Sequence, residues 1–312
     1  MRWLNRQLGL ITSVLLAGAI LSGAIPRVDA AMSLGKIMPV GDSITYGSSS
    51  PSIVPGAYRD RLNTDLKNAG YSFTFVGSST ANPSTQLTTD GQTHQEGHGS
   101  YQVDMITSNL DGNIPNSAGP NDGGYWLTGT GDCGPVDPAF VLLHIGTNDI
   151  ANNIDLGTGG NDTSHLQTRL RNLITKIVTL RPNANVIVST LIPIATNEAK
   201  GKVLTYNEAI KKAIVPDFVA AKKYVSYVDN YKNFVDASGN ILGWGDPNFI
   251  SPPLSSDGLH PTQDGYNLMG DTWAAGIKAA TATPEPSTIV LLITGLLGLL
   301  AYALRKRLGS AL

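Results

Sequence analysis

Three short polar segments, far apart in the chain, carry the side chains with the clearest chemical potential. They are Gly41-Asp42-Ser43, Gly146-Thr147-Asn148-Asp149 and Asp257-Gly258-Leu259-His260. Ser43 offers a hydroxyl nucleophile, and Asn148 offers an amide donor for a developing oxyanion. His260 offers a base, with Asp257 three residues before it. Acyl transfer through a serine requires this set of groups, so the sequence predicts an enzyme if folding brings the segments together.

His260 is the preferred base among the five histidines. The carboxylate of Asp257 can accept the Nδ1 proton and hold the tautomer whose Nε2 takes the serine proton. His94 and His98 have the i, i+4 spacing of a zinc pair, but the glycines around them disfavour the helix that such a pair requires. We therefore expect neither a metal nor an organic cofactor.

The elements that must position these residues follow from the pattern of apolar residues. Short apolar runs alternate with amphipathic stretches, which predicts a three-layer α/β/α sandwich around a central, mostly parallel sheet. The expected strands are 34–40, 72–76, 139–145, 186–192 and 225–228. The expected helices are 58–68, one that begins near 166, 203–219 with a break near Pro216, and 262–280 with Leu268, Met269 and Trp273 inward. Ser43 then follows the first strand, at the edge where open parallel sheets bind ligands.

Both ends of the chain differ from this body. Residues 1–30 combine two early arginines, an apolar run from about Leu8 to Ile25 and small residues near Ala30, the pattern of a secretory signal peptide. An uncleaved membrane anchor is the alternative. In residues 284–312 an apolar stretch, 289–304, precedes Arg305-Lys306-Arg307, so we expect a membrane segment with its basic end in the cytoplasm. Residues 31–283 then form one exported catalytic domain.

Composition narrows the class of partner. The chain of 312 residues is 41% hydrophobic and 15% charged, as expected of a globular protein. The body between the two ends is net acidic and contains no basic run, which argues against nucleic acid as a partner. Cys133 is the only cysteine, so no disulfide can form within the chain.

The three segments also resemble the conserved blocks of a known superfamily. Met38 to Gly47 (MPVGDSITYG), Leu143 to Asp149 (LHIGTND) and Asp257 to Pro261 (DGLHP) are similar to blocks one, three and five of the SGNH, or GDSL, hydrolases. The resemblance implies a flavodoxin-like fold and a carboxylic ester hydrolase. It also implies Ser43 as nucleophile, His260 as base and Asp257 as its partner. The backbone N–H of Ser43 and the side chain of Asn148 would line the oxyanion hole.

A third oxyanion donor is expected from block two, which Glu96 to Asp104 resembles. The family normally uses a glycine N–H here, and ungapped matching places Ser100 at that position, one residue after Gly99. Both residues are therefore candidates. A backbone donor survives the change from glycine to serine if its φ is negative.

The substrate is predicted from a narrower resemblance. The first block, the strand ending Phe75-Val76-Gly77-Ser78 and the Glu96-Gly97-His98 segment are similar to carbohydrate esterase family three and related acetylesterases. This implies the removal of O-acetyl groups from polysaccharide, an acylated carbohydrate. The aromatic residues Tyr125, Trp126 and Trp244 would suit stacking on sugars or would anchor loops.

Two alternatives remain at this stage. One is a lysophospholipase, thioesterase or short-chain lipase of the same superfamily, and the other is a non-catalytic surface protein that binds polysaccharide. The C-terminal segment resembles the PEP-CTERM sorting signal of Gram-negative bacteria. That resemblance implies an exosortase-type processing enzyme as a partner, transient membrane association and a final place at the cell surface or outside the cell.

Overall fold

The computed structural model describes residues 32–111, 124–128, 136–157, 165–245, 249, 251–282 and 292–302. The predicted signal peptide, 1–30, lies outside the described residues. Of the predicted sorting segment, 284–312, only 292–302 is described, and it is an exposed helix. No helix within the described part of the chain is both long and apolar enough to span a bilayer.

One sheet of six strands forms the centre of the fold. Its members are β1 (Met32–Gly41), β2 (Tyr71–Phe75), β3 (Glu96–Gly97), β4 (Phe140–His144), β5 (Asn185–Ser189) and β6 (Val225–Val228). The order is β2-β1-β4-β5-β6, and β3 also pairs with β1. The pairings of β1 with β3 and β4, of β4 with β5 and of β5 with β6 are all parallel. The predicted parallel sheet is confirmed, although β3 was not predicted because two residues show no periodicity.

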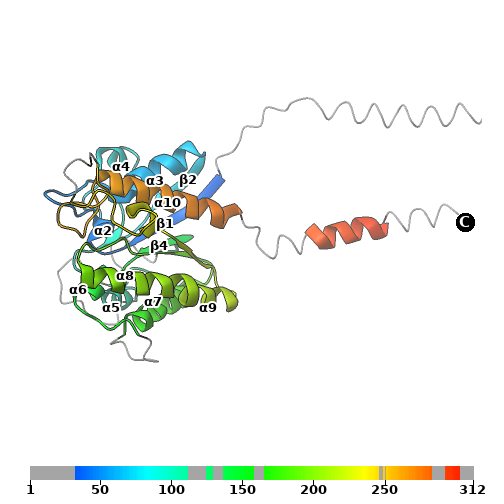
Figure 1. Ribbon diagram of the computed structural model, residues 1–312. Coiled ribbons are helices and arrows are strands. Elements are labelled where there is room, and N and C mark those ends of the chain that lie inside the picture. Colours follow the sequence, from blue (N-terminus) through cyan, green and yellow to red (C-terminus); the bar gives the residue numbers. More distant parts are fainter. Residues whose placement is uncertain are drawn as a thin grey trace, which may run out of the picture. The chain divides into compact units, whose positions relative to one another are not determined.

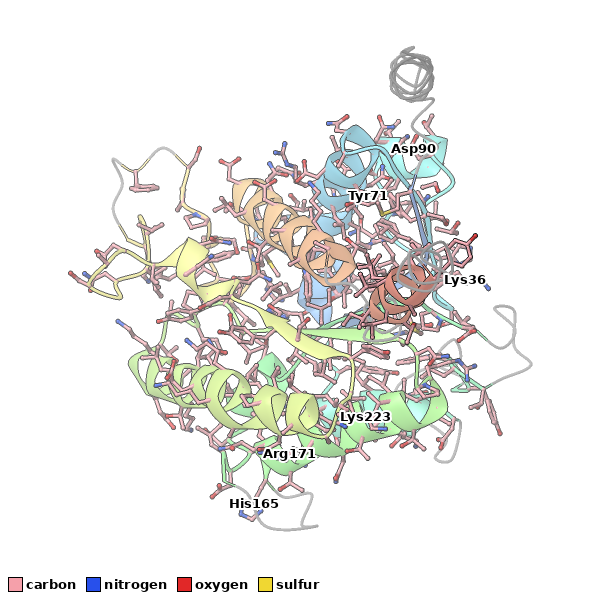
Figure 2. The ribbon with its side chains drawn as sticks, turned by 90° about the vertical axis from the view of Figure 1, so that its right-hand side faces the viewer. Lys36, Tyr71, Asp90, His165, Arg171 and Lys223 are labelled. Atoms are coloured by element: carbon pink, nitrogen blue, oxygen red, sulfur yellow. The ribbon has the colours of Figure 1, made fainter. Side chains whose placement is uncertain are left out.

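Helices cover both faces of this sheet (Figures 1 and 2). On one face lie α3 (Ala57–Asn68) and α10 (Gln263–Ala282), and on the other lie α5 (Val103–Asn109), α7 (Leu166–Leu180) and α8 (Asn197–Ala209). Side chains of a strand alternate between faces, so Ile37 packs with α3 and α10 while Met38 packs with α5 and α7. The two cores confirm the three-layer architecture.

Shorter elements complete the chain, and several of them carry the residues of interest. They are α2 (Ser43–Tyr46), α4 (Thr85–Thr89), α6 (Thr147–Ala151), the π-helix Ile210–Ile214, α9 (Val215–Ala220) and a 3₁₀ helix, Tyr231–Phe234.

Two details of the predicted helices are wrong. The break expected near Pro216 does not occur, because α8 continues through the π-helical turn into α9 and Pro216 lies in the first turn of α9. Inside a continuous helix a proline removes one hydrogen bond and clashes with the preceding turn. Here Pro216 directly follows the π turn, in which the N–H of Val215 bonds to the carbonyl of Ile210, five residues earlier, and this wider turn accommodates the proline. In α10, Met269 and Trp273 are buried as predicted, but Leu268 is 37% exposed. Leu268 and Met269 are neighbours about 100° apart on the helix, and only one of them follows the buried stripe.

Candidate active site

Ser43 is presented by a sharp turn between β1 and α2. The strand ends at Gly41, Asp42 caps the helix by accepting a hydrogen bond from the N–H of Ile44 at 2.9 Å, and Ser43 is the first helical residue. A Cβ at Gly41 would collide with the carbonyl of His144 and the side chain of Thr45. Glycine is therefore required where β1 approaches β4, and the turn leaves the Ser43 side chain partly exposed at the sheet edge.

The structure brings Ser43, His260 and Asp257 into one hydrogen-bonded chain. Ser43 Oγ lies 2.9 Å from His260 Nε2, although 217 positions separate them. His260 Nδ1 lies 2.7 Å from Asp257 Oδ2. The His260 side chain is 16% exposed and that of Asp257 is 30% exposed, so solvent reaches the group. This geometry allows the imidazole to take the hydroxyl proton while the carboxylate holds the ring.

The turn at Asp257 is organised around its carboxylate. Oδ1 accepts hydrogen bonds from the N–H groups of Leu259 and His260 and from the hydroxyl of Ser255, at 2.8 to 2.9 Å. Partial burial raises the pKa of Asp257, but the hydrogen bonds from His260, Leu259 and Ser255 together outweigh it and lower the pKa to about 2. Asp257 is therefore ionised at any pH at which the fold is expected to operate.

Asn148 lies in α6, directly after β4, and is tied to the block-two segment. Its Nδ2 donates to the carbonyl of Tyr101 at 2.9 Å. An amide nitrogen carries two hydrogens, so this bond orients the side chain while leaving it a second donor.

The two candidates for the third donor, Gly99 and Ser100, are both exposed. Ser100 has a φ of +66°, so the condition stated above for a serine donor, a negative φ, is not met. Its backbone takes the left-handed conformation that glycine adopts most readily. This explains why a glycine suits the position that Ser100 occupies.

A buried ion pair connects the block-two segment to α6 and α7. The carboxylate of Asp149, which is fully buried, accepts from the N–H of Val103 at 3.0 Å and from the Arg169 guanidinium at 2.9 Å. Arg169 also donates to Gln102 Oε1 at 2.9 Å. Burial raises the pKa of Asp149 to about 6, against the lowering effect of Val103 and Arg169. Asp149 thus braces the segment around Asn148.

Asp42 is a second buried carboxylate at the sheet edge. Burial is the largest influence and raises its pKa to about 7, with Asp149 adding to the rise and the Ile44 N–H and Thr147 hydroxyl opposing it. Its Oδ2 has no hydrogen bond of good geometry among the described residues, although Thr147 lies near. Asp42 therefore serves as a helix cap that tolerates protonation.

The histidine pair with zinc spacing has other contacts. His98 Nε2 lies 2.8 Å from Glu96 Oε2, and the His98 ring stacks on Trp126 with centroids 4.6 Å apart. His94 Nδ1 lies 2.8 Å from the carbonyl of Gly77. The described residues contain no cluster of His, Cys, Asp or Glu able to hold a metal ion.

The three aromatic residues considered for sugar stacking differ in exposure. Trp126 is only 2% exposed and anchors its loop in the core against His98, so it cannot stack on a polymer. Tyr125 and Trp244 are 49% and 38% exposed. The sequence alone could not tell the buried Trp126 from the exposed Tyr125 and Trp244, because burial of an aromatic side chain in a loop depends on what the loop packs against.

Fold and motifs together define a hydrolase of carboxylic esters. The chain belongs to the family of GDSL-like lipases and acylhydrolases, whose model matches residues 37–273. The predicted superfamily and the predicted enzyme class are confirmed at this level.

A curated relative of this chain is described as an esterase. The chain is 28% identical over 287 residues to a multidomain esterase from Ruminococcus flavefaciens, a match that covers 88% of this chain and 33% of that protein. This chain therefore spans about a third of the length of that relative.

Two solved structures share the fold. A family 3 carbohydrate esterase from Clostridium thermocellum is 29% identical, with a TM-score of 0.56 over 79% of this chain and 97% of that one. A carbohydrate esterase family 3 protein from Talaromyces cellulolyticus is 20% identical, with a TM-score of 0.53 over 80% and 99%; this second likeness concerns the fold alone.

Several residues near the site were not identified from sequence. Arg169 contacts Asp149, and Lys202 lines a pocket with Asp257, only through the tertiary fold. The spacing of Glu198 and Lys202, four residues apart on one helix, is a signal for an ion pair, but it does not indicate that the pair lines a pocket together with Asp257.

Proposed function

We propose that this protein is an exported serine esterase that removes O-acetyl groups from carbohydrate. The observation that carries the proposal is the hydrogen-bonded chain Ser43–His260–Asp257, with heavy-atom distances of 2.9 and 2.7 Å. A serine hydroxyl is a weak nucleophile until a positioned base takes its proton. These three residues meet that requirement at the carboxyl edge of the sheet.

In the proposed first half-reaction, Ser43 Oγ attacks the ester carbonyl while His260 Nε2 takes the hydroxyl proton. The ionised Asp257 stabilises the imidazolium that forms and keeps Nδ1 protonated. His260 then gives its proton to the departing alcohol, which leaves an acyl group on Ser43. In the second half-reaction, His260 takes a proton from water, the hydroxide attacks the acyl carbonyl, and the acid is released as Ser43 recovers its proton.

The oxyanion is stabilised by donors from three segments. Ser43 is the first residue of α2, where the backbone N–H has no carbonyl four residues earlier in the helix. Asn148 contributes the amide hydrogen that Tyr101 does not use. We assign the third donor to the N–H of Ser100, because ungapped matching places Ser100 where the family has its glycine. Its positive φ departs from the negative value set as the condition for a serine donor, but it is a conformation that glycine adopts readily. Each such donor contributes roughly 3 to 4 kcal/mol of transition-state stabilisation.

The acetylated-carbohydrate substrate rests on relatives. The solved family 3 carbohydrate esterase from Clostridium thermocellum is 29% identical and aligns over almost its full length. Export is proposed from residues 1–30, and processing by an exosortase-type enzyme at the cell surface is proposed from residues 284–312.

Substitution Ser43→Ala tests the mechanism. We expect hydrolysis of p-nitrophenyl acetate to fall on the order of 10⁶-fold. The helix cap is Asp42 and not Ser43, so the thermal unfolding temperature should stay the same. Turnover retained in this variant would exclude the proposed nucleophile.

The substrate class is tested by comparing two products. We expect acetate release from acetylated xylan to exceed fatty-acid release from lysophospholipid. A preference for lysophospholipid would support the alternative of a lysophospholipase while leaving the serine mechanism intact.

A further inference from the structure

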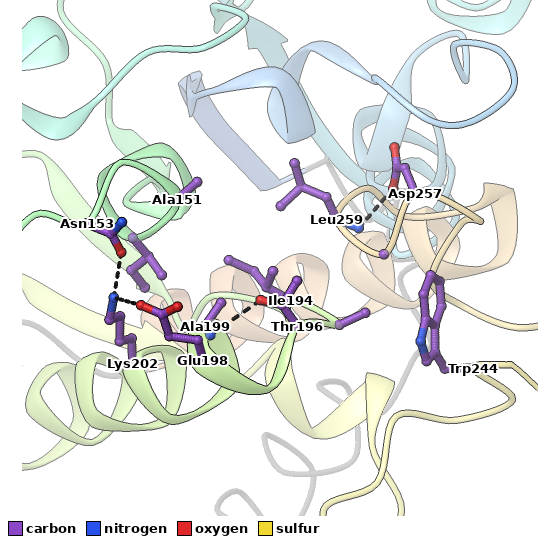
Figure 3. Close-up of a pocket in the computed structure, with 13 residues that line it drawn as sticks. Ala151, Asn153, Ile194, Thr196, Glu198, Ala199, Lys202, Trp244, Asp257 and Leu259 are labelled. Carbon is purple, nitrogen blue, oxygen red and sulfur yellow. Dashed lines mark hydrogen bonds and ion pairs between the residues drawn. The ribbon is translucent and has the colours of Figure 1, made fainter.

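A pocket opens beside the loop that carries Asp257 and His260 (Figure 3). Its volume is about 480 Å³, within the range of about 300 to 1,000 Å³ common for small-ligand sites. Its walls come from α6 and the residues after it, from the beginning of α8 and from the loop 257–259. No residue of the Ser43 turn lines it, so it lies next to the ester-cleaving group rather than within it.

Two walls of the pocket adjoin residues of the candidate active site. Ile150 belongs to the same short helix as Asn148, and Leu259 directly precedes His260. Asp257 itself lines the pocket. The segment just before α8 is tied to this loop, because Ala195 N–H donates to the carbonyl of Gly258 at 2.8 Å. A substrate whose ester reaches Ser43 can therefore extend into this space.

Trp244 forms the aromatic end of the pocket. It is 38% exposed, and its six-membered ring lies against Gly258. A Cβ at Gly258 would come within 2.9 to 3.0 Å of that ring, and the φ of Gly258 is +70°. The absence of a side chain at Gly258 thus lets the indole pack directly on the loop. The result is an apolar, partly solvated surface held in a fixed position next to the site.

The opposite end of the pocket is polar, as Figure 3 shows for Asn153, Glu198 and Lys202. Lys202 Nζ donates to Glu198 Oε1 at 2.9 Å and to Asn153 Oδ1 at 2.6 Å. Its positive charge is therefore already paired. Asp257 is the remaining charged residue of the lining, so the pocket as a whole carries one more negative than positive charge. An anionic ligand would be repelled, whereas a neutral ligand with hydroxyl groups meets donors and acceptors.

We propose that this pocket binds the alcohol part of the ester as a neutral sugar ring. The indole of Trp244 packs against the ring, and the Glu198–Lys202 pair hydrogen-bonds to its hydroxyl groups. Uronic acids are disfavoured because their carboxylate would lie near Glu198 and Asp257. This inference rests on the proposed esterase function and adds the residues that select the sugar.

Kinetics with three acetyl esters test the proposal. Ethyl acetate has an alcohol too small to fill the pocket, acetylated xylo-oligosaccharides carry a neutral sugar, and acetylated mannuronate oligosaccharides carry an anionic one. For Trp244→Ala we expect kcat/KM on the xylo-oligosaccharides to fall about tenfold. On ethyl acetate it should stay within about twofold of wild type, since no contact to a small alcohol is lost. Trp244→Phe keeps a flat ring and should retain most of the activity on the neutral sugar.

Two further variants sharpen the test. Tyr125→Ala removes another exposed aromatic residue that does not line the pocket, and should leave all three rates unchanged. Glu198→Gln removes a negative charge, and should raise kcat/KM on the mannuronate substrate relative to the neutral one by about fivefold.

Several outcomes would overturn the inference. One is an equal loss on ethyl acetate and on the sugar esters in Trp244→Ala, which would give Trp244 only a structural role. Another is a changed preference of Trp244→Ala between ethyl acetate and ethyl butyrate, the latter measured as a fourth substrate, which would make the pocket an acyl site. Absence of ethyl acetate hydrolysis in the wild-type protein would instead contradict the proposed function itself.

Discussion

The carboxyl groups of Asp42 and Asp257 belong to the same site region, but their surroundings shift their pKa values in opposite directions. Asp42 is buried in the turn before Ser43, and desolvation raises its pKa to about 7. Asp257 accepts hydrogen bonds from two backbone N–H groups, a hydroxyl and an imidazole, and its pKa falls to about 2. When the surroundings shift the pKa values of two carboxyl groups in opposite directions, the two groups can perform different roles. Asp257 suits a permanent anion beside His260, while Asp42 suits a structural cap.

The raised pKa of Asp42 predicts a pH-dependent stability. Between about pH 4 and pH 7 the folded state retains a proton that the unfolded state releases, so stability falls as pH rises through this window and then levels off. Asp42→Asn keeps the cap oxygen and removes the titration. We expect its unfolding temperature to exceed that of wild type by roughly 5 to 10 °C at pH 8 and by much less at pH 5.

Differential scanning calorimetry of both proteins at the two pH values checks this prediction. A difference that is the same at pH 5 and pH 8 would show that Asp42 is ionised throughout. Asp90, a half-buried carboxylate paired with Lys67 at 2.6 Å, is a control position whose change to Asn should not reproduce the pattern.

The left-handed backbone of Ser100 supports a second prediction at this scale. If Ser100 contributes only its N–H, Ser100→Gly should keep kcat within about twofold, because glycine adopts this φ without the cost of about 1 to 2 kcal/mol that a Cβ brings. Ser100→Pro lacks the N–H and cannot reach a positive φ, and should lose most activity. Equal activity of the two variants on p-nitrophenyl acetate would remove Ser100 from the oxyanion hole.

At the scale of elements, the position of Asn148 depends on how three segments are joined. The loop before α5 contacts α6 through the Tyr101–Asn148 hydrogen bond, and the first residue of α5 does so through the Val103–Asp149 hydrogen bond. Helix α7 is tied to the same place by Arg169, which pairs with the buried Asp149. Since these bonds are short and largely buried, they hold the predicted oxyanion donors at a constant separation.

Arg169→Met is expected to disturb this junction. Removing one partner leaves a buried carboxylate unpaired, which typically costs about 3 to 5 kcal/mol, so we expect a lower unfolding temperature and a lower kcat. Arg171→Met is a matched control on the same helix, because Arg171 pairs with the exposed Asp217. Exposed ion pairs contribute about 0 to 1 kcal/mol to stability, so Arg171→Met should lower the unfolding temperature much less than Arg169→Met.

A double variant separates charge from packing. Adding Asp149→Asn to Arg169→Met should recover part of the stability by removing the unpaired charge. Urea unfolding measures both variants, and equal losses for Arg169→Met and Arg171→Met would contradict a structural role for the buried pair.

At the scale of the whole molecule, the order of the strands explains why the site lies where it does. The chain leaves β1 toward β2 on one side and later enters β4 on the other side of β1. Open parallel sheets bind ligands where the order reverses in this way. Ser43 follows β1 and Asn148 follows β4, so the two lie across this boundary. The loop before α10 then brings His260 to Ser43.

Much of this arrangement was predictable from local patterns. Buried parallel strands are read from continuous apolar runs such as 140–143 and 186–188, and α7 shows its apolar stripe at helical spacing. The motif residues could be named because the types and short spacings of groups that perform acyl transfer are restricted. Errors arose where neighbours in space decide, as with Leu268, with Pro216 after a π-helical turn, and with Trp126 in its buried loop.

The amino-acid sequence by itself determined the fold class, the family and the identity of the serine, histidine and aspartate, since these depend on periodicity and on motifs a few residues long. Only the tertiary structure decided that Ser43 and His260 touch, that Ser100 has a positive φ, and that Trp244 and Lys202 border one pocket. Such contacts join positions tens to hundreds of residues apart. They depend on strand order and on close packing between layers, which no local pattern of side chains encodes.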